Sequence, residues 1–365
     1  MFSSKLSPKT QRNVSRIIPF GLIWLFSGWV FLINDLTVTG NQNQIPESAI
    51  TITIPIFIFA SISLFIVGTL IGTIEIILLE KKFKTFSLPA KLFSKFVIYA
   101  FVLFSIILIT YPIAGAIESG RSPFHPDVLT KLVRFLSSVV FFNTALQLSV
   151  ELFLSLIYAT ISEHLGYNVL RNFFTGKYHR PKHEHRIFMF LDMKNSTTIA
   201  EKLGHYKYFE FLQAYYDSLS DAIIQHQGEV YQYIGDEIVL TWKLGKSKHN
   251  HHWYACYFAL KATLEQLNPY FKEMYGISPD FRAGAHAGEV TTGELGALKK
   301  EIVFTGDVLN ISARLQALCK TYETDLVFSD VLTLGLKLDE NQKKTHLGEI
   351  VLKGKSSKTS IYTIR

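Results

Sequence analysis

The C-terminal half contains two aspartates that each follow a short apolar run typical of a β-strand: Asp192 in FMFLDMKNST and Asp236 in YQYIGDEIVLTW. Each carboxylate is therefore expected where a strand gives way to a turn. Carboxylates at two neighbouring strand ends can bind two divalent cations, which is an arrangement used in phosphoryl chemistry. Taken alone, the Asp192 motif is explained by a helix cap and the Asp236 motif by a Gly-Asp turn. The two motifs together indicate a two-metal site.

The residues after Asp192 favour a helix start. Asn195 or Ser196 can cap that helix, and Thr197 follows them. Backbone N–H groups in the first turn of a helix have no partner within the helix, and they suit the phosphates of a nucleotide. We therefore expect Ser196 and Thr197 to contribute to substrate binding.

Other polar residues that suit a nucleotide lie further along the chain. Asn310 and Arg314 in GDVLNISARLQAL are four residues apart and share one face of a predicted helix. Arg314 can stabilise charge on a transferring phosphorus, and Asn310 can hold a sugar oxygen or orient the substrate. A surface ion pair between Arg314 and Asp307 is the plainer alternative. Lys353, beside Gly354, offers a point charge for phosphates, although a solvated lysine at a strand end is equally ordinary.

The segments that must position these groups alternate between strand and helix patterns from residue 184 onward. The predicted strands are residues 186–191, 229–234, 238–242, 280–287, 302–304, 326–328, 350–352 and 361–364, and the predicted helices are residues 206–225, 252–274 and 308–319. The opening order is β-α-β-β-α-β. This order predicts an α/β fold built on a split, ferredoxin-like unit.

The N-terminal half is apolar and nearly free of acidic residues, and the mean hydropathy of the chain is +0.21. Runs long enough to cross a membrane occupy residues 17–34, 51–75, 96–116 and 132–158. Buried core helices are the alternative, but consecutive runs with short polar connectors disfavour it. The first run resembles the core of a signal peptide, yet no small-residue cleavage site follows it. We therefore predict four membrane-spanning helices.

Lysine and arginine indicate how these helices are oriented. Basic residues precede the first run and fill the connector after the second, whereas the loop at residues 36–50 has none. The positive-inside rule therefore places both termini in the cytoplasm and the protein in the inner (plasma) membrane as a multi-pass protein. The formal net charge of +7 fits contact with anionic membrane lipids. No groove-reading motif indicates nucleic-acid binding.

The fourth apolar run carries Asn143, Gln147 and Glu151 on one helical face. Ionisable groups inside a span usually face other helices, so Glu151 marks either a sensing or ion site or a polar contact between helices. Residues 159–183 then predict a short helical linker. The linker either pairs with a second subunit and passes on membrane motion, or connects the two parts passively.

Residues 184–365 resemble the catalytic domain of the class III nucleotidyl cyclases, the family of adenylate and guanylate cyclases, in its membrane-anchored bacterial type. The resemblance rests on five motifs in family order: FLDMKNST, YIGDEIVL, FRAGAHAGEVTTGELG, GDVLNISARL and LKGKSSKTSIY. It implies that two Mg²⁺ or Mn²⁺ ions bind to Asp192 and Asp236 in each active site. It also implies roles in ribose positioning for Asn310, in transition-state stabilisation for Arg314 and in phosphate binding for Lys353.

The resemblance further implies that two such domains act head to tail, so a chain with one domain is expected to be a homodimer. The resulting plan comprises a basic cytoplasmic N-terminus, a four-helix transmembrane domain, a helical linker and a cytoplasmic catalytic domain, at residues 1–16, 17–158, 159–183 and 184–365. The expected activity is conversion of ATP to 3′,5′-cyclic AMP and pyrophosphate.

The sequence departs from the family pattern where the base is chosen. Four residues before Asp236, adenylate cyclases usually have lysine and guanylate cyclases glutamate, whereas this chain has Gln232. The second base-contacting position, usually aspartate or threonine for adenine and cysteine for guanine, is Val303. An amide can pair with the edge of adenine, and no guanine-type glutamate is present. We therefore expect ATP, with GTP as the alternative.

Three other functions fit parts of the sequence. A non-catalytic membrane receptor with a nucleotide-binding domain would explain the same organisation, although every chemical residue is present. A diguanylate cyclase has a similar turn to YIGDEIV, but it would leave Asn310, Arg314 and Lys353 without a role. Transport by the apolar helices rests on Glu151 alone.

Overall fold

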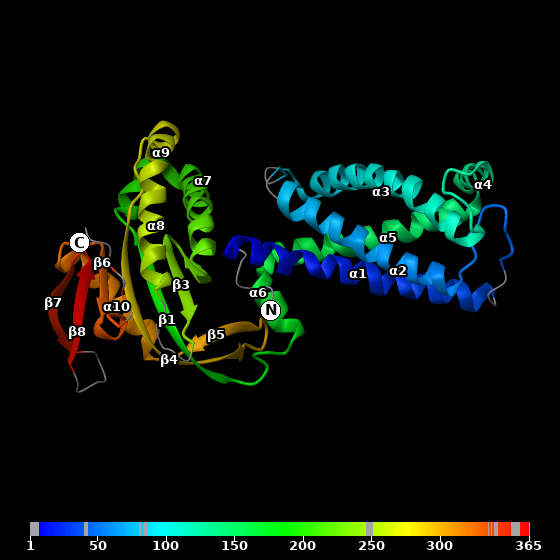
Figure 1. Cartoon of the computed structure of the whole chain (residues 1–365). Helices are drawn as coiled ribbons and strands as arrows, with labels where there is room; N and C mark the ends of the chain where they lie inside the picture. Colours follow the sequence, from blue (N-terminus) through cyan, green and yellow to red (C-terminus); the bar gives the residue numbers. More distant parts are fainter. Residues whose placement is uncertain are drawn as a thin grey trace. The chain divides into compact units, whose positions relative to one another are not determined.

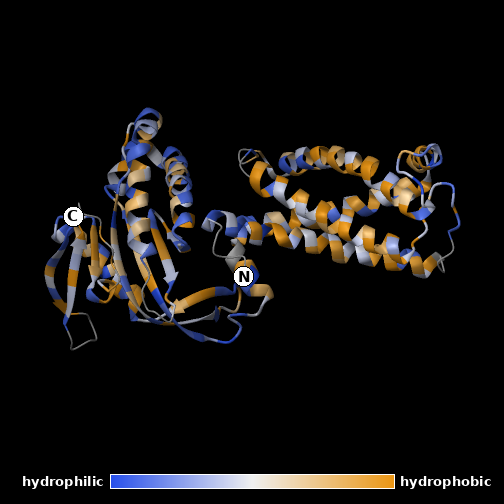
Figure 2. Ribbon diagram, in the orientation of Figure 1, coloured by the Kyte–Doolittle hydropathy of each residue, from blue (hydrophilic) through white to orange (hydrophobic). Residues whose placement is uncertain are grey.

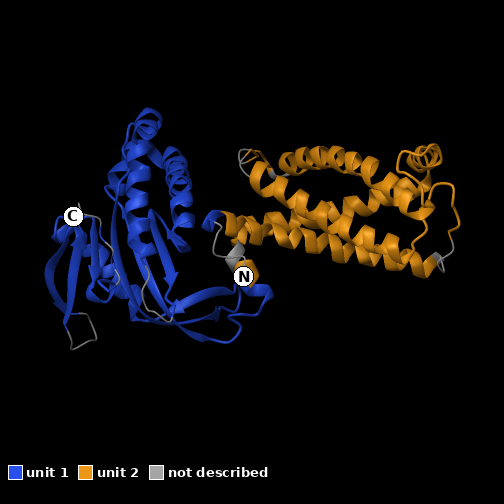
Figure 3. Ribbon diagram, viewed as in Figure 1, with its two compact units in different colours: residues 1–9, 172–365 blue, residues 10–171 orange. Residues whose placement is uncertain are grey.

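The computed structural model of the chain describes residues 7–39, 43–79, 82–83, 86–245, 251–334, 336, 338, 342–351 and 358–364. The chain divides into two compact units, one formed by residues 10–171 and the other by residues 1–9 and 172–365 (Figure 3). The finer limits at residues 16, 158 and 183 stay predictions. The helix that contains residue 158 continues without a break to Leu165.

The unit of residues 10–171 is helical. Its helices are α1 (Pro8–Thr39), α2 (Ile54–Thr73) with a π-helical turn η1 (Ile74–Leu79), α3 (Leu88–Ser119), α4 (Pro126–Leu136) and α5 (Val139–Leu165), and α6 (Tyr167–Phe174) follows. Among the described residues, four stretches are long and apolar enough to cross a membrane: α1, α2 with η1, α3 and α5 (Figures 1 and 2). These match the predicted apolar runs in number and order.

The fourth spanning helix starts later than the sequence suggested. The apolar run at residues 132–158 is divided, because α4 ends at Leu136 and α5 begins at Val139. The hydroxyl of Ser138 accepts a hydrogen bond from the backbone N–H of Phe141 at 3.4 Å and caps α5. A capping serine of this kind begins a new helix inside an otherwise continuous apolar run.

Small residues let the membrane-type helices approach one another closely. A Cβ atom added at Gly68 or Gly72 of α2 would collide with Trp24 or Phe20 of α1. The indole of Trp24 also donates a hydrogen bond to the hydroxyl of Ser155 on α5 at 2.8 Å. Inside a lipid bilayer the hydrophobic effect does not drive helices together. Helices there usually pack through close backbone contact and interhelical hydrogen bonds.

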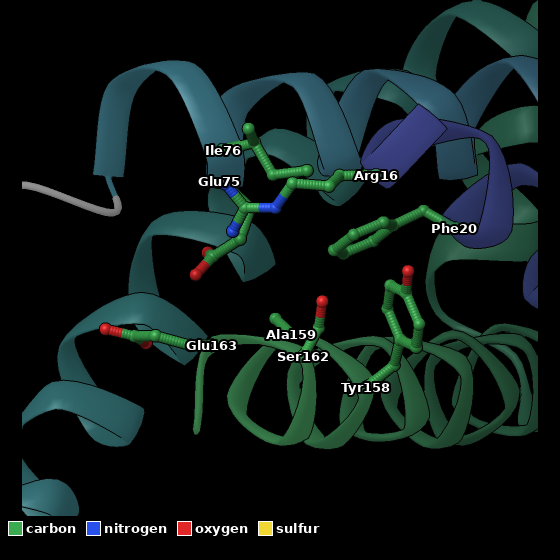
Figure 4. A pocket seen from close by; sticks show the side chains of 8 residues that line it. All are labelled: Arg16, Phe20, Glu75, Ile76, Tyr158, Ala159, Ser162 and Glu163. Carbon is green, nitrogen blue, oxygen red and sulfur yellow. The ribbon is translucent and has the colours of Figure 1, made fainter. Parts of the chain in front are cut away.

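Among the described residues of this helical unit, the carboxylates of Glu75 and Glu151 are buried. Glu151, one of the residues that the sequence singled out, is 0% exposed and accepts a hydrogen bond from Gln147 at 3.1 Å. Glu75 lies in η1 and accepts hydrogen bonds from Tyr99, at 2.7 Å, and from Lys95. Glu75 lines a cavity of about 10 Å³, the space of a single water molecule. Figure 4 shows the side chains that line it. Each of these hydrogen bonds gives a buried carboxylate a polar partner inside the helical unit.

The second unit is an α/β fold around a mixed sheet (Figure 1). Its strands are β1 (Lys182–Met193), β2 (Glu229–Ile234), β3 (Glu237–Lys243), β4 (Phe281–Leu295), β5 (Glu301–Thr305), β6 (Leu326–Ser329), β7 (Lys344–Val351) and β8 (Lys358–Ile364). They are arranged in the order β2-β3-β1-β4-β6-β8-β7, with β5 paired to β4. Of these pairs, β4 and β6 are parallel and the others are antiparallel.

The helices of this unit are α7 (Ser196–Gln225), α8 (His252–Gln266), α9 (Asn268–Tyr275) and α10 (Asp307–Thr321), and a 3₁₀ turn, η2 (Asp330–Leu332), follows β6. The chain order β1-α7-β2-β3-α8-β4 confirms the predicted β-α-β-β-α-β unit. The single helix predicted at residues 252–274 is divided at Leu267. Pro269 explains the division, since proline fits the first turn of a new helix and not the interior of a long one.

Successive side chains of β1 pack alternately into two hydrophobic cores, one on each face of the sheet. Ile187, Met189 and Leu191 pack with residues of α7 and α8, whereas Phe188 and Phe190 pack with Val308 of α10 and with residues of β3, β4 and β5. Because successive side chains of a strand point to opposite faces, Asp192 belongs to the α10 face.

Candidate active site

The strand register brings Asp192 next to the turn that contains Asp236. Leu191 of β1 pairs with Ile238 of β3, and Asp192 is the next residue of β1. Asp236 lies in the β2–β3 turn, which is closed by the pair Ile234 and Glu237. The two predicted metal ligands therefore come together at one edge of the sheet, as the sequence motifs indicated.

The turn before Asp236 is held by a second element. Gly235 has φ = 64°, a left-handed conformation that glycine adopts without strain. The hydroxyl of Tyr216 on α7 donates a hydrogen bond to the carbonyl oxygen of Gly235. The ring of Tyr216 also packs against Tyr233 of β2, with 4.6 Å between the ring centroids. The helix that follows Asp192 in sequence thus positions the turn that carries Asp236.

Negative charge accumulates at this edge. Burial raises the pKa of Asp192, and the charge of Asp236 raises it further, whereas Gln316 and Arg282 act in the opposite direction. Burial followed by repulsion from the two aspartates also raises the pKa of Glu237 to about 7. Like charges held this close are unfavourable unless a cation or a proton balances them.

The carboxylates fit divalent cations. The Oδ2 atom of Asp236 is buried and has no hydrogen-bond partner in the described part of the chain. Carboxylate oxygens are the ligands that Mg²⁺ and Mn²⁺ prefer. Within the described ranges, no group of three or more His, Cys, Asp or Glu side chains is placed to hold a metal ion. Any cation held here therefore needs oxygens from substrate or water as well, which is usual for Mg²⁺ at phosphate sites.

The loop after Asp192 opens onto the first turn of α7. Asn195 occupies the N-cap position with φ = 58°, but its side chain makes no capping hydrogen bond, so the predicted side-chain cap does not form. Instead, its carbonyl oxygen accepts the N–H of Ile199 at 2.9 Å. Ser196 is the first helical residue and is half-buried, and Thr197 is exposed. Both lie at the N-terminal end of the helix, where an anion is stabilised.

Asn310 and Arg314 lie on the exposed side of α10. The opposite side of this helix is buried through Val308, Ile311, Ser312 and Leu315. The described residues include no hydrogen bond from Asn310 or Arg314 to either aspartate. The structure therefore places Asp192 and Asp236 together at the sheet edge, and Asn310 and Arg314 together on α10. Among the described residues, no hydrogen bond of Asn310 or Arg314 connects the two pairs within one chain.

The remaining predicted contacts lie on other strands or outside the described residues. Gln232 of β2 is half-buried and pairs with Val239 of β3, on the α10 face of the sheet. Val303 of β5 is half-buried and pairs with Gly293 of β4. Lys353 lies outside the described residues, between β7 and β8.

The residues adjacent to Gln232 and Val303 bring β2 and β5 close together. The ring of Tyr231 lies 5.0 Å from that of Phe304, centroid to centroid. Both rings also contact Phe188. The two base-contacting positions that the resemblance implied are thus on strands joined by one aromatic cluster.

Three residues beside the aspartates were not anticipated from the sequence. Gln316 of α10 donates a hydrogen bond to Asp192 at 3.1 Å. Arg282 of β4 pairs with Asp192 across the sheet, and Glu237 follows Asp236 directly. The adjacency of Glu237 was visible in GDE. The other two become apparent only when the strand register and the position of α10 are known.

Comparison with known proteins agrees with this arrangement. Residues 179–365 match the adenylate and guanylate cyclase catalytic domain. The chain is 29% identical over 204 residues to adenylate cyclase 2 of Rhizobium meliloti (strain 1021), a match that covers 56% of each chain. It is 30% identical over 182 residues to adenylate cyclase 1 of the same organism, covering 48% of this chain and 27% of that protein. The chain thus spans about half the length, or less, of these relatives.

A solved structure of a bacterial light-regulated adenylyl cyclase has a similar fold. The TM-score is 0.52 at 19% sequence identity, and the match covers 62% of this chain and 65% of that one. At this identity the likeness concerns the fold alone. Since the matched domain occupies residues 179–365 of a 365-residue chain, the protein belongs to the adenylate and guanylate cyclase catalytic domain family.

Proposed function

We propose that this protein is a membrane-anchored adenylate cyclase that converts ATP to 3′,5′-cyclic AMP and pyrophosphate. The observation that carries the proposal is the pairing of Asp192 and Asp236 at one sheet edge, with the Oδ2 atom of Asp236 buried and unpartnered among the described residues. The start of α7 lies directly after Asp192 and offers N–H groups to phosphate. Both features suit a metal-dependent reaction at the phosphates of a nucleotide.

The reaction is an internal displacement at the α-phosphorus of the nucleotide. The 3′-oxygen of the ribose forms a bond to this phosphorus, the bond to the bridging oxygen breaks, and pyrophosphate leaves while the 3′-hydroxyl proton passes to water. When bound, two divalent cations held by Asp192 and Asp236 would favour the deprotonated 3′-hydroxyl and balance phosphate charge. The protein contributes mainly positioning and charge stabilisation.

The roles of the other residues follow from their chemistry. Arg314 stabilises charge that develops on the transferring phosphorus, and Asn310 orients the ribose. Lys353 and the first turn of α7, with Ser196 and Thr197, hold the phosphates. Each of these groups acts by contact with the substrate, so each is expected to affect turnover more than folding.

The positions of these residues favour a homodimer as the active form. Asn310 and Arg314 are exposed on α10, and within the described residues neither bonds to the aspartates of its own chain. A second copy can supply them, so that each active site takes Asp192 and Asp236 from one subunit and Asn310 and Arg314 from the other. Closed two-fold assemblies of this kind are the commonest oligomers of soluble domains.

Adenine is the base that the available contacts suit best. The amide of Gln232 both donates and accepts, so it can pair with the edge of adenine. Val303 can do neither, and it therefore leaves base choice to Gln232. The curated relatives reported above are named adenylate cyclases, which agrees with ATP. GTP is the alternative substrate.

The long apolar helices are the proposed membrane anchor. Four stretches of the described chain are long and apolar enough to span a bilayer. The basic residues near their predicted cytoplasmic ends favour contact with anionic lipids, and we expect the catalytic unit on the cytoplasmic side of the inner (plasma) membrane. The whole arrangement is that of a multi-pass membrane enzyme.

Product identification tests the proposal directly. Membranes with the full chain would be given ATP or GTP separately, with Mn²⁺ or Mg²⁺, and the cyclic nucleotide would be identified by mass spectrometry. We expect cyclic AMP from ATP and little cyclic GMP. Absence of both products would contradict the proposal, and tight nucleotide binding without turnover would instead favour a receptor.

A second comparison tests the base contacts. Gln232→Lys combined with Val303→Asp introduces the residues usual in adenylate cyclases, so we expect the ratio of ATP to GTP turnover to rise. An unchanged ratio would show that these two positions do not contact the base.

A further inference from the structure

The side chain of Gln316 joins the helix that carries Asn310 and Arg314 to Asp192. The side-chain amide of Gln316 on α10 donates a hydrogen bond to Oδ2 of Asp192 at 3.1 Å. Gln316 is half-buried, so water competes with this bond less than at an open surface.

The position of Gln316 relative to Asp192 is fixed by close packing of α10 on the sheet. A Cβ atom added at Gly284 of β4 would overlap the backbone of Gln316 and the carbonyl oxygen of Ser312. The hydroxyl of Ser312 lies within hydrogen-bond distance of two carbonyl oxygens, that of Val308 on its own helix at 2.9 Å and that of Phe188 on β1 at 3.2 Å, and its hydrogen can go to either. One turn beyond Gln316, the thiol of Cys319 donates to the carbonyl oxygen of Ala283 at 3.2 Å. Backbone contacts on both sides therefore hold the amide in place.

The two faces of α10 carry residues with different partners. Gln316 and Ser312 face the sheet of their own chain, whereas Asn310 and Arg314 are exposed. We propose that Gln316 is a positioning residue, whose amide orients the Asp192 carboxylate for metal binding and ties it to the helix that presents Asn310 and Arg314 to the second subunit. This inference rests on the proposed function, and it assigns to Gln316 a role in metal affinity.

The expected effect follows from the loss of the hydrogen bond. Without the amide, the Asp192 carboxylate is free to turn toward Arg282, its cross-strand neighbour. Groups that orient a metal ligand through a hydrogen bond typically change metal affinity by roughly 10- to 100-fold when they are removed. We expect a loss of that size in Mn²⁺ affinity, with a smaller effect on the turnover rate at saturating Mn²⁺.

The test measures Mn²⁺ binding to the full chain in detergent, by the electron paramagnetic resonance signal of free Mn²⁺ and without nucleotide. Gln316→Met keeps the length of the side chain and removes the donor, and Gln316→Asn keeps the amide but shortens its reach. Gln213→Met, at an exposed position of α7, is the matched control. Both Gln316 variants should weaken Mn²⁺ binding, and the control should not. The Mn²⁺ concentration for half-maximal turnover should rise in parallel.

The outcomes separate this inference from the proposed function. If Gln316→Asn folds and binds Mn²⁺ as tightly as the wild type, Gln316 does not position Asp192 and the inference is wrong. If Gln316→Met unfolds, the Mn²⁺ affinity of Gln316→Asn alone tests the inference. A wild type that binds Mn²⁺ but forms no cyclic nucleotide would contradict the function and leave the positioning role standing. A wild type that binds no Mn²⁺ would overturn both.

Discussion

Tyr216 donates its hydroxyl hydrogen to the carbonyl oxygen of Gly235, and this bond ties the turn before Asp236 to α7. The same helix begins at Ser196, three residues after the end of β1, the strand that carries Asp192 next to its last residue. One helix therefore fixes the surroundings of both aspartates, at its first turn and again near its middle. The relative position of the two aspartates, the proposed metal ligands, therefore depends on Tyr216, which is not itself a proposed ligand.

Replacement of the tyrosine should loosen the turn. Tyr216→Phe removes one hydrogen bond, so we expect a loss of about 1 kcal/mol in the free energy of unfolding and weaker Mn²⁺ binding. Gly235→Ala should cost about 1–2 kcal/mol, because alanine is strained at a left-handed φ. Thermal unfolding and Mn²⁺ titration would measure both effects. Tyr206→Phe, at a residue that is 81% exposed, is the control. If Tyr216→Phe and Tyr206→Phe had the same free energy of unfolding and the same Mn²⁺ affinity, the Tyr216 hydroxyl would not hold the turn before Asp236.

Removal of charge from the metal pair should separate activity from stability. Asp236→Asn takes away one of two repelling carboxylates, so we expect turnover to disappear while the unfolding temperature stays the same or rises. Asp192→Asn should also abolish turnover. Glu265→Gln, an exposed change on α8 with the same loss of charge, should alter neither property. A large drop in unfolding temperature for Asp236→Asn would mean that the aspartate is structural.

Complementation between two inactive variants should reveal shared active sites. Arg314→Ala alone is expected to lower turnover by about 10²–10³-fold, as for a lost charge-stabilising donor. Co-expression of Arg314→Ala with Asp192→Asn should restore about one quarter of wild-type turnover, because half of randomly formed dimers are mixed and each has one intact site. Lys320→Ala, exposed on the last turn of α10, should keep full activity alone. No recovery in the mixture would argue against sites formed by two subunits.

A buried ion network near the start of β1 should govern acid stability. Glu184 accepts hydrogen bonds from Arg186 at 2.8 Å and from Lys243 at 2.6 Å, and Arg186 also binds Glu229 at 2.9 Å. Burial alone would raise the pKa of Glu184, but the hydrogen bonds and charges of Lys243 and Arg186 outweigh it and lower that pKa to about 2. The carboxylate therefore binds a proton less readily in the folded protein than in the unfolded chain.

The direction of the pH dependence follows from that difference. The stability that Glu184 contributes is complete above its unfolded pKa of about 4.3 and is lost as the pH falls toward 2. We expect the difference in unfolding free energy between wild type and Glu184→Gln to be large at pH 7 and to shrink below pH 4. Arg186→Met should lose up to about 3–5 kcal/mol, since it removes one of the two cations bonded to the buried Glu184 carboxylate and leaves only Lys243. An equal difference at pH 3 and pH 7 would contradict this account.

The sequence predicted the parts of the fold that depend on local pattern. Alternation of apolar residues located most strands, and the positions of Asp192 and Asp236 at strand ends predicted that the two carboxylates lie close together. Their role as metal ligands stays a prediction. The division at Pro269 and the start of α5 at Val139 were missed, because a continuous apolar pattern concealed a proline and a capping serine. Both errors concern where a helix begins.

Contacts between distant segments could not be predicted in the same way. Gln316 and Asp192 are separated by 124 residues, and they meet only because α10 lies directly on β4 at Gly284. Spacing and periodicity along the sequence do not predict a contact between residues so far apart in the chain. Tyr216 meets Gly235 for a similar reason, since α7 must first fold back along the sheet. The roles of Asn310, Arg314 and Lys353 came from the family resemblance and stay predictions.

Gly284 suggests a way to sort related domains whose activity is unknown. Any side chain at this position would push α10 off the sheet, so a chain could retain both aspartates, Asn310 and Arg314 and still be unable to align them. A domain with a larger residue at the equivalent of Gly284 would look intact by its motifs and yet be silent in a cyclase assay. Inspection of this one backbone position would then distinguish active enzymes from nucleotide-binding or purely structural relatives before any protein is made.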